Sequence, residues 1–109
     1  MNKPSILIYV YEPDKNLLKE VCAGIEEEGV YYEVVSKDDS DIKNLTYQST
    51  NDSILGTGIG LLGSRIALSL TSLPYGKEVF NIKEASTVQA RKLGANAARA
   101  VKRKSFKEL

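Results

Sequence analysis

The amino-acid sequence predicts an α/β fold with a mixed sheet, and two observations support this prediction. Residues 5–36 show a strand–helix–strand pattern, whose short connection makes the two strands parallel by the usual crossover rule. Residues 53–62 and 64–74 are apolar segments joined tightly at Gly63, which predicts an antiparallel hairpin. The length of 109 residues suits one domain, residues 1–109, with one modest core.

The first three elements have clear boundaries in the sequence. Residues 5–12 are nearly continuously apolar, as expected of a central strand that is covered on both faces. A helix follows from Asp14, a suitable N-cap, and Gly29 ends it. Its apolar stripe consists of Leu17, Leu18, Val21, Cys22 and Ile25. Residues 30–36 then form the second strand.

The middle of the chain is the least regular part. Residues 37–53 are polar and predict a loop followed by a short, weakly held helix. The few apolar positions there are Ile42, Leu45 and Tyr47. Residues 53–62 predict a third strand, one face of which is cleared of side chains and open to close approach by a backbone or helix. The glycines that clear it are Gly56, Gly58 and Gly60.

Gly58, Gly60 and Gly63 also form a G-x-G-x-x-G pattern, which raises the alternative of a dinucleotide-binding loop. Such a loop needs a helix N-terminus directly after the glycines. Residues 64–74 would fit a helix through some of their apolar positions, but their alternation and poor helix formers favour a fourth strand. We therefore prefer a hairpin turn in which Gly63 supplies a positive φ.

Two elements remain at the C-terminal end. Residues 78–83 predict a short fifth strand, and residues 84–104 predict a terminal helix. The apolar side of this helix consists of Ala90, Leu93, Ala97, Ala100 and Val101. Small residues on the same helix permit close approach, against the sheet or against another protein, and the former is the commoner case. These are Gly94, Ala95, Ala97 and Ala98.

The composition argues against an independent enzyme. The chain has no histidine, which removes the commonest general base and metal ligand, and its one cysteine, Cys22, lies on an apolar stripe and is expected in the core. A formal charge of +1 gives no strong attraction to nucleic acid. Since no apolar run approaches a membrane span or signal peptide, we expect a cytoplasmic location, with a bacterial microcompartment left open.

Three consecutive carboxylates, Glu26, Glu27 and Glu28, crowd the end of the first helix. The negative end of the helix dipole disfavours them unless a cation is near. Helical geometry points Glu27 outward, opposite the apolar stripe. One carboxylate is too few for a hard cation, so a metal would need ligands from another chain; a solvated acidic helix end is the alternative. The further interface candidates are Glu20, Ala23, Glu26 and Glu28.

The terminal helix is rich in basic residues, which leaves RNA binding open. The basic positions are Arg91, Lys92, Arg99, Lys102, Arg103 and Lys104. No aromatic residue is interleaved with them for base stacking, and the helix dipole favours cations in a last turn in any case. We therefore rank nucleic acid low among the expected partners.

Two motifs together resemble a known family. Residues 24–29 read G-I-E-E-E-G before a strand, and the chain closes on N-A-A-R-x-V-K at residues 96–102 and F-K-E-L at residues 106–109. At this spacing and length the chain resembles the small subunit of diol and glycerol dehydratase reactivases. The resemblance implies a three-layer α/β/α domain with a five-stranded mixed sheet of order 2-1-3-4-5 and strand 4 antiparallel, like that of some anticodon-binding domains.

The resemblance also implies a non-catalytic function. In that family a large, chaperone-like ATPase subunit, which binds ATP or ADP, is capped by a small subunit that imitates the dehydratase medium subunit. Exchange of these subunits lets damaged cobalamin leave the dehydratase, so that adenosylcobalamin can replace it. The middle glutamate of the acidic run, by motif position Glu27, is implied to bind Mg²⁺ or Ca²⁺ at the interface with the large subunit.

Two other functions stay open at this point. The chain could be a medium-subunit-like component of a cobalamin-dependent dehydratase, which predicts direct cobalamin affinity. It could also be a small RNA-binding domain of anticodon-binding type, which predicts a steep salt dependence. The sequence does not choose between glycerol and propanediol dehydratase as the client.

Overall fold

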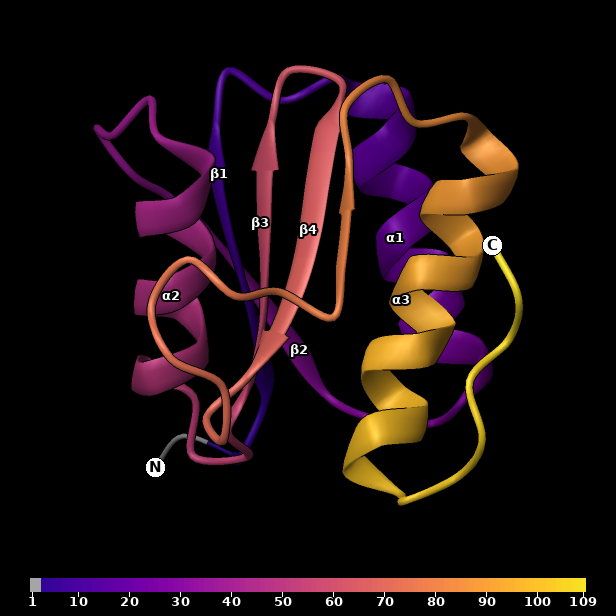
Figure 1. Cartoon of the computed structure of the whole chain (residues 1–109). Helices are drawn as coiled ribbons and strands as arrows, with labels where there is room; N and C mark the ends of the chain where they lie inside the picture. Colours follow the sequence, from indigo (N-terminus) through magenta and orange to yellow (C-terminus); the bar gives the residue numbers. More distant parts are fainter. Residues whose placement is uncertain (1–2) are drawn as a thin grey trace.

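The computed structural model describes residues 3–109 and shows three helices around a five-stranded sheet (Figure 1). The sheet order β2-β1-β3-β4-β5 confirms the expected order 2-1-3-4-5. Strands β1 to β3 are parallel, and β4 is antiparallel to both of its neighbours, β3 and β5. The elements are β1 (Ile6–Tyr11), α1 (Lys15–Glu27), β2 (Tyr32–Ser36), α2 (Ile42–Asp52), β3 (Thr57–Leu62), β4 (Arg65–Leu70), β5 (Phe80–Ile82) and α3 (Thr87–Val101).

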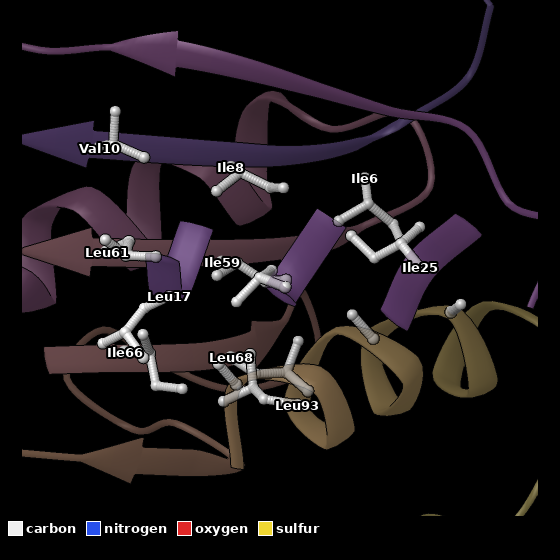
Figure 2. Packing of buried hydrophobic residues seen from close by; sticks show 14 residues of the cluster. Ile6, Ile8, Val10, Leu17, Ile25, Ile59, Leu61, Ile66, Leu68 and Leu93 are labelled. Atoms are coloured by element: carbon white, nitrogen blue, oxygen red, sulfur yellow. The ribbon is translucent and has the colours of Figure 1, made fainter. Parts of the chain in front are cut away.

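Helices α1 and α3 cover one face of the sheet, and α2 covers the other, so the architecture is three-layered α/β/α (Figure 1). The main core lies between the sheet and the α1–α3 pair. Figure 2 shows how inward residues of β1, β3 and β4 meet those of the two helices. Its largest fully buried side chains include Ile6, Ile8, Ile25, Ile59, Leu61, Ile66, Leu68 and Leu93. Cys22 is half-buried and packs against this core, as expected.

The glycine-rich pattern forms a hairpin turn. Residue Leu62 at the end of β3 pairs with Arg65 at the start of β4, and Gly63 between them has φ +57°. A strand follows the glycines, and no helix N-terminus is there to face a phosphate. The preferred hairpin is therefore confirmed, and the dinucleotide-loop alternative is wrong.

Helix α2 corrects the prediction of a short, weakly held helix. It spans 11 residues, with Asp41 as its N-cap, and buries Ile42 and Leu45. Its other buried positions are hydroxyl residues, Thr46, Ser49 and Thr50, which carry no apolar signal in the sequence. These small side chains let α2 lie directly on β3, so close packing replaces the wide apolar stripe that the sequence lacks.

Gly58 and Gly60 make this close packing possible. A Cβ at Gly58 would lie 2.2 Å from Thr50 N, and one at Gly60 would lie 2.3 Å from Thr46 Oγ1. The expected close approach of a helix is therefore confirmed at these two positions. Gly56 does not belong to the cleared face, because it precedes β3 in a turn with φ +67°.

Helix α3 is shorter at both ends than the predicted span of residues 84–104, since it runs from Thr87 to Val101. Ser86 and Gln89 form a reciprocal capping box at its start. Its last residue is Val101 rather than Lys104, because Arg103 adopts a left-handed conformation with φ +58°. Lys104 N then donates to Arg99 O at 2.8 Å, which closes the helix end without glycine. None of the described helices is long and apolar enough to span a bilayer.

Candidate functional site

The two sequence motifs, which lie about two-thirds of the chain apart, meet where α1 crosses α3. Gly24 and Gly94 are at the crossing, and both helices approach backbone to backbone there. A Cβ at Gly24 would lie 2.1 Å from Arg91 O, and one at Gly94 would lie 2.0 Å from Val21 O. The small residue Gly94 thus serves contact with another helix of the same chain, rather than contact with the sheet.

The acidic run is the C-terminal end of α1, and its geometry follows from its flanking residues. Ile25 is fully buried in the core and fixes the rotation of the helix. Gly29 has φ +75° and ends the helix, with its N–H donating to Glu26 O at 3.0 Å. The three glutamates between these residues therefore point in three different directions.

Glu27 points outward, as helical geometry predicts, and binds a cation of the same chain. Arg91 Nη1 donates to Glu27 Oε2 at 2.8 Å, and Arg91 Nε donates to Glu20 Oε1 at 2.8 Å. These carboxylates raise the pKa of the Arg91 guanidinium above its usual range, chiefly through the hydrogen bond to Glu20. The Glu27 side chain is still 52% exposed to solvent.

Glu28 is held much more firmly than Glu27. Its carboxylate accepts from Lys102 Nζ at 2.8 Å and from Arg99 Nε at 3.2 Å, and the side chain is only 12% exposed. Lys102 Nζ also donates to the backbone oxygen of Glu28 at 2.7 Å, which satisfies the helix end. The hydrogen bond from Lys102, together with the charge of Arg99, lowers the pKa of Glu28.

Glu26 faces β2 rather than α3. It accepts a hydrogen bond from Tyr32 Oη at 2.6 Å, and this bond, together with burial, raises the pKa of Tyr32. Ala23 is half-buried on α1. Of the candidate interface residues, the structure thus brings Glu20 and Glu27 together, and it engages Glu26 and Glu28 in separate contacts.

The C-terminal tail folds back beside α3 (Figure 1). Asn96 is fully buried and uses both ends of its amide on one tail residue: Nδ2 donates to Lys107 O at 2.9 Å, and Oδ1 accepts from Lys107 N at 2.6 Å. The ring of Phe106 packs edge-on against Phe80 of β5, with centroids 5.6 Å apart. The N-A-A-R-x-V-K motif therefore anchors both the acidic run and the tail.

Beside the Arg91 pairs, the surface is hollowed between α1, α3 and the tail. The hollow is lined by Glu20, Glu27, Val88, Arg91, Lys92 and Lys107, among others. Val88 is 61% exposed. An exposed apolar residue beside exposed charges suits a protein partner better than a buried small molecule.

The carboxylates here fit a divalent cation only as part of a shared site. Within residues 3–109, no group of three His, Cys, Asp or Glu side chains could hold an ion. Glu27 offers an outward carboxylate, and hard cations take six or more oxygen ligands. Another chain and water would have to supply the rest.

Sequence reasoning missed the cations that form ion pairs with the acidic run. Arg91, Arg99 and Lys102 were considered only as part of a basic helix, whose last turn the dipole favours, but in the structure they bind Glu20, Glu27 and Glu28. The available signal was complementarity: an acidic helix end and a basic helix in one small chain. These three residues are half of the basic positions that suggested RNA binding.

Comparison with known proteins identifies the family. The model of the family described as "Dehydratase medium subunit" matches residues 3–107. The chain is 33% identical, over 97% of its length and 92% of the relative, to the propanediol dehydratase-reactivating factor small subunit of Salmonella typhimurium. It is 31% identical, over 97% of its length and 86% of the relative, to the diol dehydratase-reactivating factor small subunit of Klebsiella michiganensis.

Solved structures agree with these sequence matches. A chain of the diol dehydratase-reactivating factor complexed with ADP and Mg²⁺ superposes with a TM-score of 0.90 at 28% identity, covering 98% of this chain and 100% of that one. A glycerol dehydratase reactivase chain gives a TM-score of 0.90 at 30% identity, covering 97% and 98%. The chain therefore belongs to the dehydratase medium-subunit family, among the small subunits of dehydratase-reactivating factors.

Proposed function

We propose that this chain is the detachable, non-catalytic subunit of a reactivase that exchanges with the medium subunit of a cobalamin-dependent diol or glycerol dehydratase. One observation carries the proposal. The family model that matches residues 3–107 is described as "Dehydratase medium subunit", whereas the similar relatives are small subunits of reactivating factors. Two roles on one fold are what replacement of one subunit by the other requires.

In this proposal the chain binds a large subunit with ATPase activity and exchanges for the medium subunit of the dehydratase. Exchange would open the dehydratase, so that damaged cobalamin leaves and adenosylcobalamin can enter. The similar solved assembly contains ADP and Mg²⁺, which supports a nucleotide and a cation in such a complex. The client, whether glycerol or propanediol dehydratase, is left open by relatives of both kinds.

Glu27 is the proposed contact with the large subunit. A divalent cation at this interface would supply attraction between carboxylates of two chains that otherwise repel. This chain's part is to present Glu27 outward at the end of a rigid helix, beside the exposed Val88. Glu28 is nearly buried between two cations and holds the helix end in place, and Glu26 faces β2 and accepts a hydrogen bond from Tyr32.

Co-purification with a tagged large subunit, with and without Mg²⁺, tests the proposal. We expect a stoichiometric complex that Mg²⁺ strengthens, and about a tenfold loss of affinity in Glu27→Gln, because one charged metal ligand is lost. Glu33→Gln is the matched control: it removes the same charge, but at an exposed position of β2 beside α2.

The absence of a complex in both conditions would contradict the proposal, and direct cobalamin and RNA binding would then be measured. A complex whose affinity is unchanged by Mg²⁺ and by Glu27→Gln would retain the subunit role but remove the cation from the interface.

A further inference from the structure

We propose that Arg91 is an internal counter-cation that binds Glu27 and Glu20 in the free subunit and competes with the divalent cation for them. Arg91 would then set the cation concentration at which the subunit joins its partner. This inference rests on the proposed function and adds its regulation.

The geometry places one guanidinium between two carboxylates. Glu20 and Glu27 are about two helical turns apart and therefore lie on one face of α1. Arg91 donates through Nε to the first and through Nη1 to the second, each at 2.8 Å. A planar guanidinium suits this fork, because its donors are fixed relative to one another. One side chain therefore neutralises the carboxylate that the proposed interface uses.

The ion pairs of Arg91 are exposed enough for a divalent cation to displace the guanidinium. The side chains of Arg91, Glu20 and Glu27 are 41%, 27% and 52% exposed. Solvent-exposed ion pairs contribute little net free energy, so a competing divalent ion can displace one. Glu28 differs in this respect, because two cations hold its nearly buried carboxylate. Of these two carboxylates, only Glu27, the middle one of the run, is arranged for release.

Displacement of Arg91 from Glu27 by a divalent cation would need motion of the Arg91 side chain alone. The backbone of Arg91 is trapped in the helix crossing, since its carbonyl oxygen lies where a Cβ of residue 24 would be. The helices therefore cannot separate at this point without losing their packing. The long arginine side chain can swing into the adjacent hollow, which it already lines. Glu20 and Glu27 would stay in place as it leaves.

The half-saturating Mg²⁺ concentration for assembly with the large subunit tests the competition. We expect Arg91→Gln to lower it about threefold to tenfold, because one positive charge in direct contact with Glu27 is removed. Lys92→Gln is the matched control: it removes the same charge from the next helix position, which also lines the hollow. We expect it to change the value less than about twofold.

A second variant should shift the half-saturating Mg²⁺ concentration in the opposite direction. Glu20→Gln leaves Arg91 with Glu27 as its one charged partner, so we expect a higher half-saturating Mg²⁺ concentration. General damage to the fold would not produce shifts of opposite sign. An Arg91→Gln value that is unchanged or higher than that of the wild-type chain would overturn the inference.

The isolated chain gives a readout that does not depend on the partner. In the isolated chain water must take the place of the partner's ligands, so Mn²⁺ binds weakly beside Glu20 and Glu27. Mn²⁺ broadens NMR signals near its binding site, and we expect signals of these two residues to broaden at several-fold lower Mn²⁺ in Arg91→Gln than in the wild-type chain. If the wild-type chain and Arg91→Gln needed equal Mn²⁺ concentrations for the same broadening, the inferred competition would be wrong. Failure of the wild-type chain to assemble at any Mg²⁺ concentration would instead contradict the proposed function.

Discussion

The two faces of the sheet are both covered through glycine contacts, but they differ in how their polar residues are used. On one face, α2 lies on Gly58 and Gly60. Its buried hydroxyls bond backbone oxygens of the same helix: Thr46 Oγ1 donates to Ile42 O at 2.7 Å, and Ser49 Oγ donates to Thr46 O at 2.8 Å. That helix satisfies these polar groups by itself.

On the other face, polar contacts join different parts of the chain. Arg91, Arg99 and Lys102 of α3 bind carboxylates of α1, and Asn96 binds the tail. These contacts span 64 to 74 residues between the helices and 11 residues to the tail. The α2 face also has contacts between separate segments, from Tyr9 to Asp52 and from Tyr75 to Asn44, but the ion pairs among the described residues all join α1 to α3. The α1–α3 face, with its exchangeable charged groups, is therefore the one that we propose for partner binding.

The largest expected effect comes from closing the glycine contacts. Gly94→Ala would put a Cβ about 2 Å from the backbone of α1, and Gly58→Ala would do the same against α2. We expect each to lower the free energy of unfolding by about 3 kcal/mol, because backbone cannot move aside as a flexible side chain can. Denaturant titration would measure both losses.

The two variants should differ in partner binding, at a temperature where both remain folded. Gly94→Ala displaces Arg91 and the end of α1, so we expect weaker assembly with the large subunit, whereas Gly58→Ala should assemble normally. Equal losses of assembly would show that the two faces are not functionally distinct.

A smaller effect is expected from the buried amide that holds the tail. Asn96→Ala removes both hydrogen bonds to Lys107. We expect a loss of about 2 kcal/mol and faster amide hydrogen exchange at residues 105–109, because two partly buried hydrogen bonds are lost.

Ser49→Ala is the matched change on the α2 face. It removes one local hydrogen bond, and we expect it to cost about 1 kcal/mol without altering exchange elsewhere. Unchanged exchange of the tail in Asn96→Ala would contradict the assignment of Asn96 as its anchor.

The smallest effect is a pH dependence that differs between the two faces. The lowered pKa of Glu28 means that its contribution to stability is present above its unfolded pKa, near 4.3, and is lost as pH falls through the folded value. We expect Glu28→Gln to cost about 1 kcal/mol at pH 7 and progressively less below about pH 4.

On the α2 face, Tyr9 should give a pH dependence of stability at alkaline rather than acid pH. Burial, followed by the hydrogen bond to Asp52, raises the pKa of Tyr9 to about 12. Its contribution is present below its unfolded pKa, near 10, and is lost between about pH 10 and 12. Tyr9→Phe should therefore reduce the alkaline loss of stability between about pH 10 and 12, as measured by thermal unfolding across pH.

Local patterns were sufficient for much of the fold. The first helix was predicted from Asp14 to Gly29, and the N-cap and the positive φ of Gly29 confirm both ends. The hairpin at Gly63 was predicted because alternation and turn chemistry act over a few residues. Helix α2 was underestimated because its buried face consists of hydroxyl residues whose burial depends on two glycines of another element.

The candidate site divides in the same way. The sequence by itself determined that Glu27 points outward at the end of α1, because helical rotation follows from the apolar stripe. Only the tertiary structure decided that Arg91 neutralises Glu27, that two cations hold Glu28, and that Asn96 holds the tail. These pairings depend on how closely α1 and α3 cross at Gly24 and Gly94, and backbone contact between distant segments leaves no periodic signal in either one.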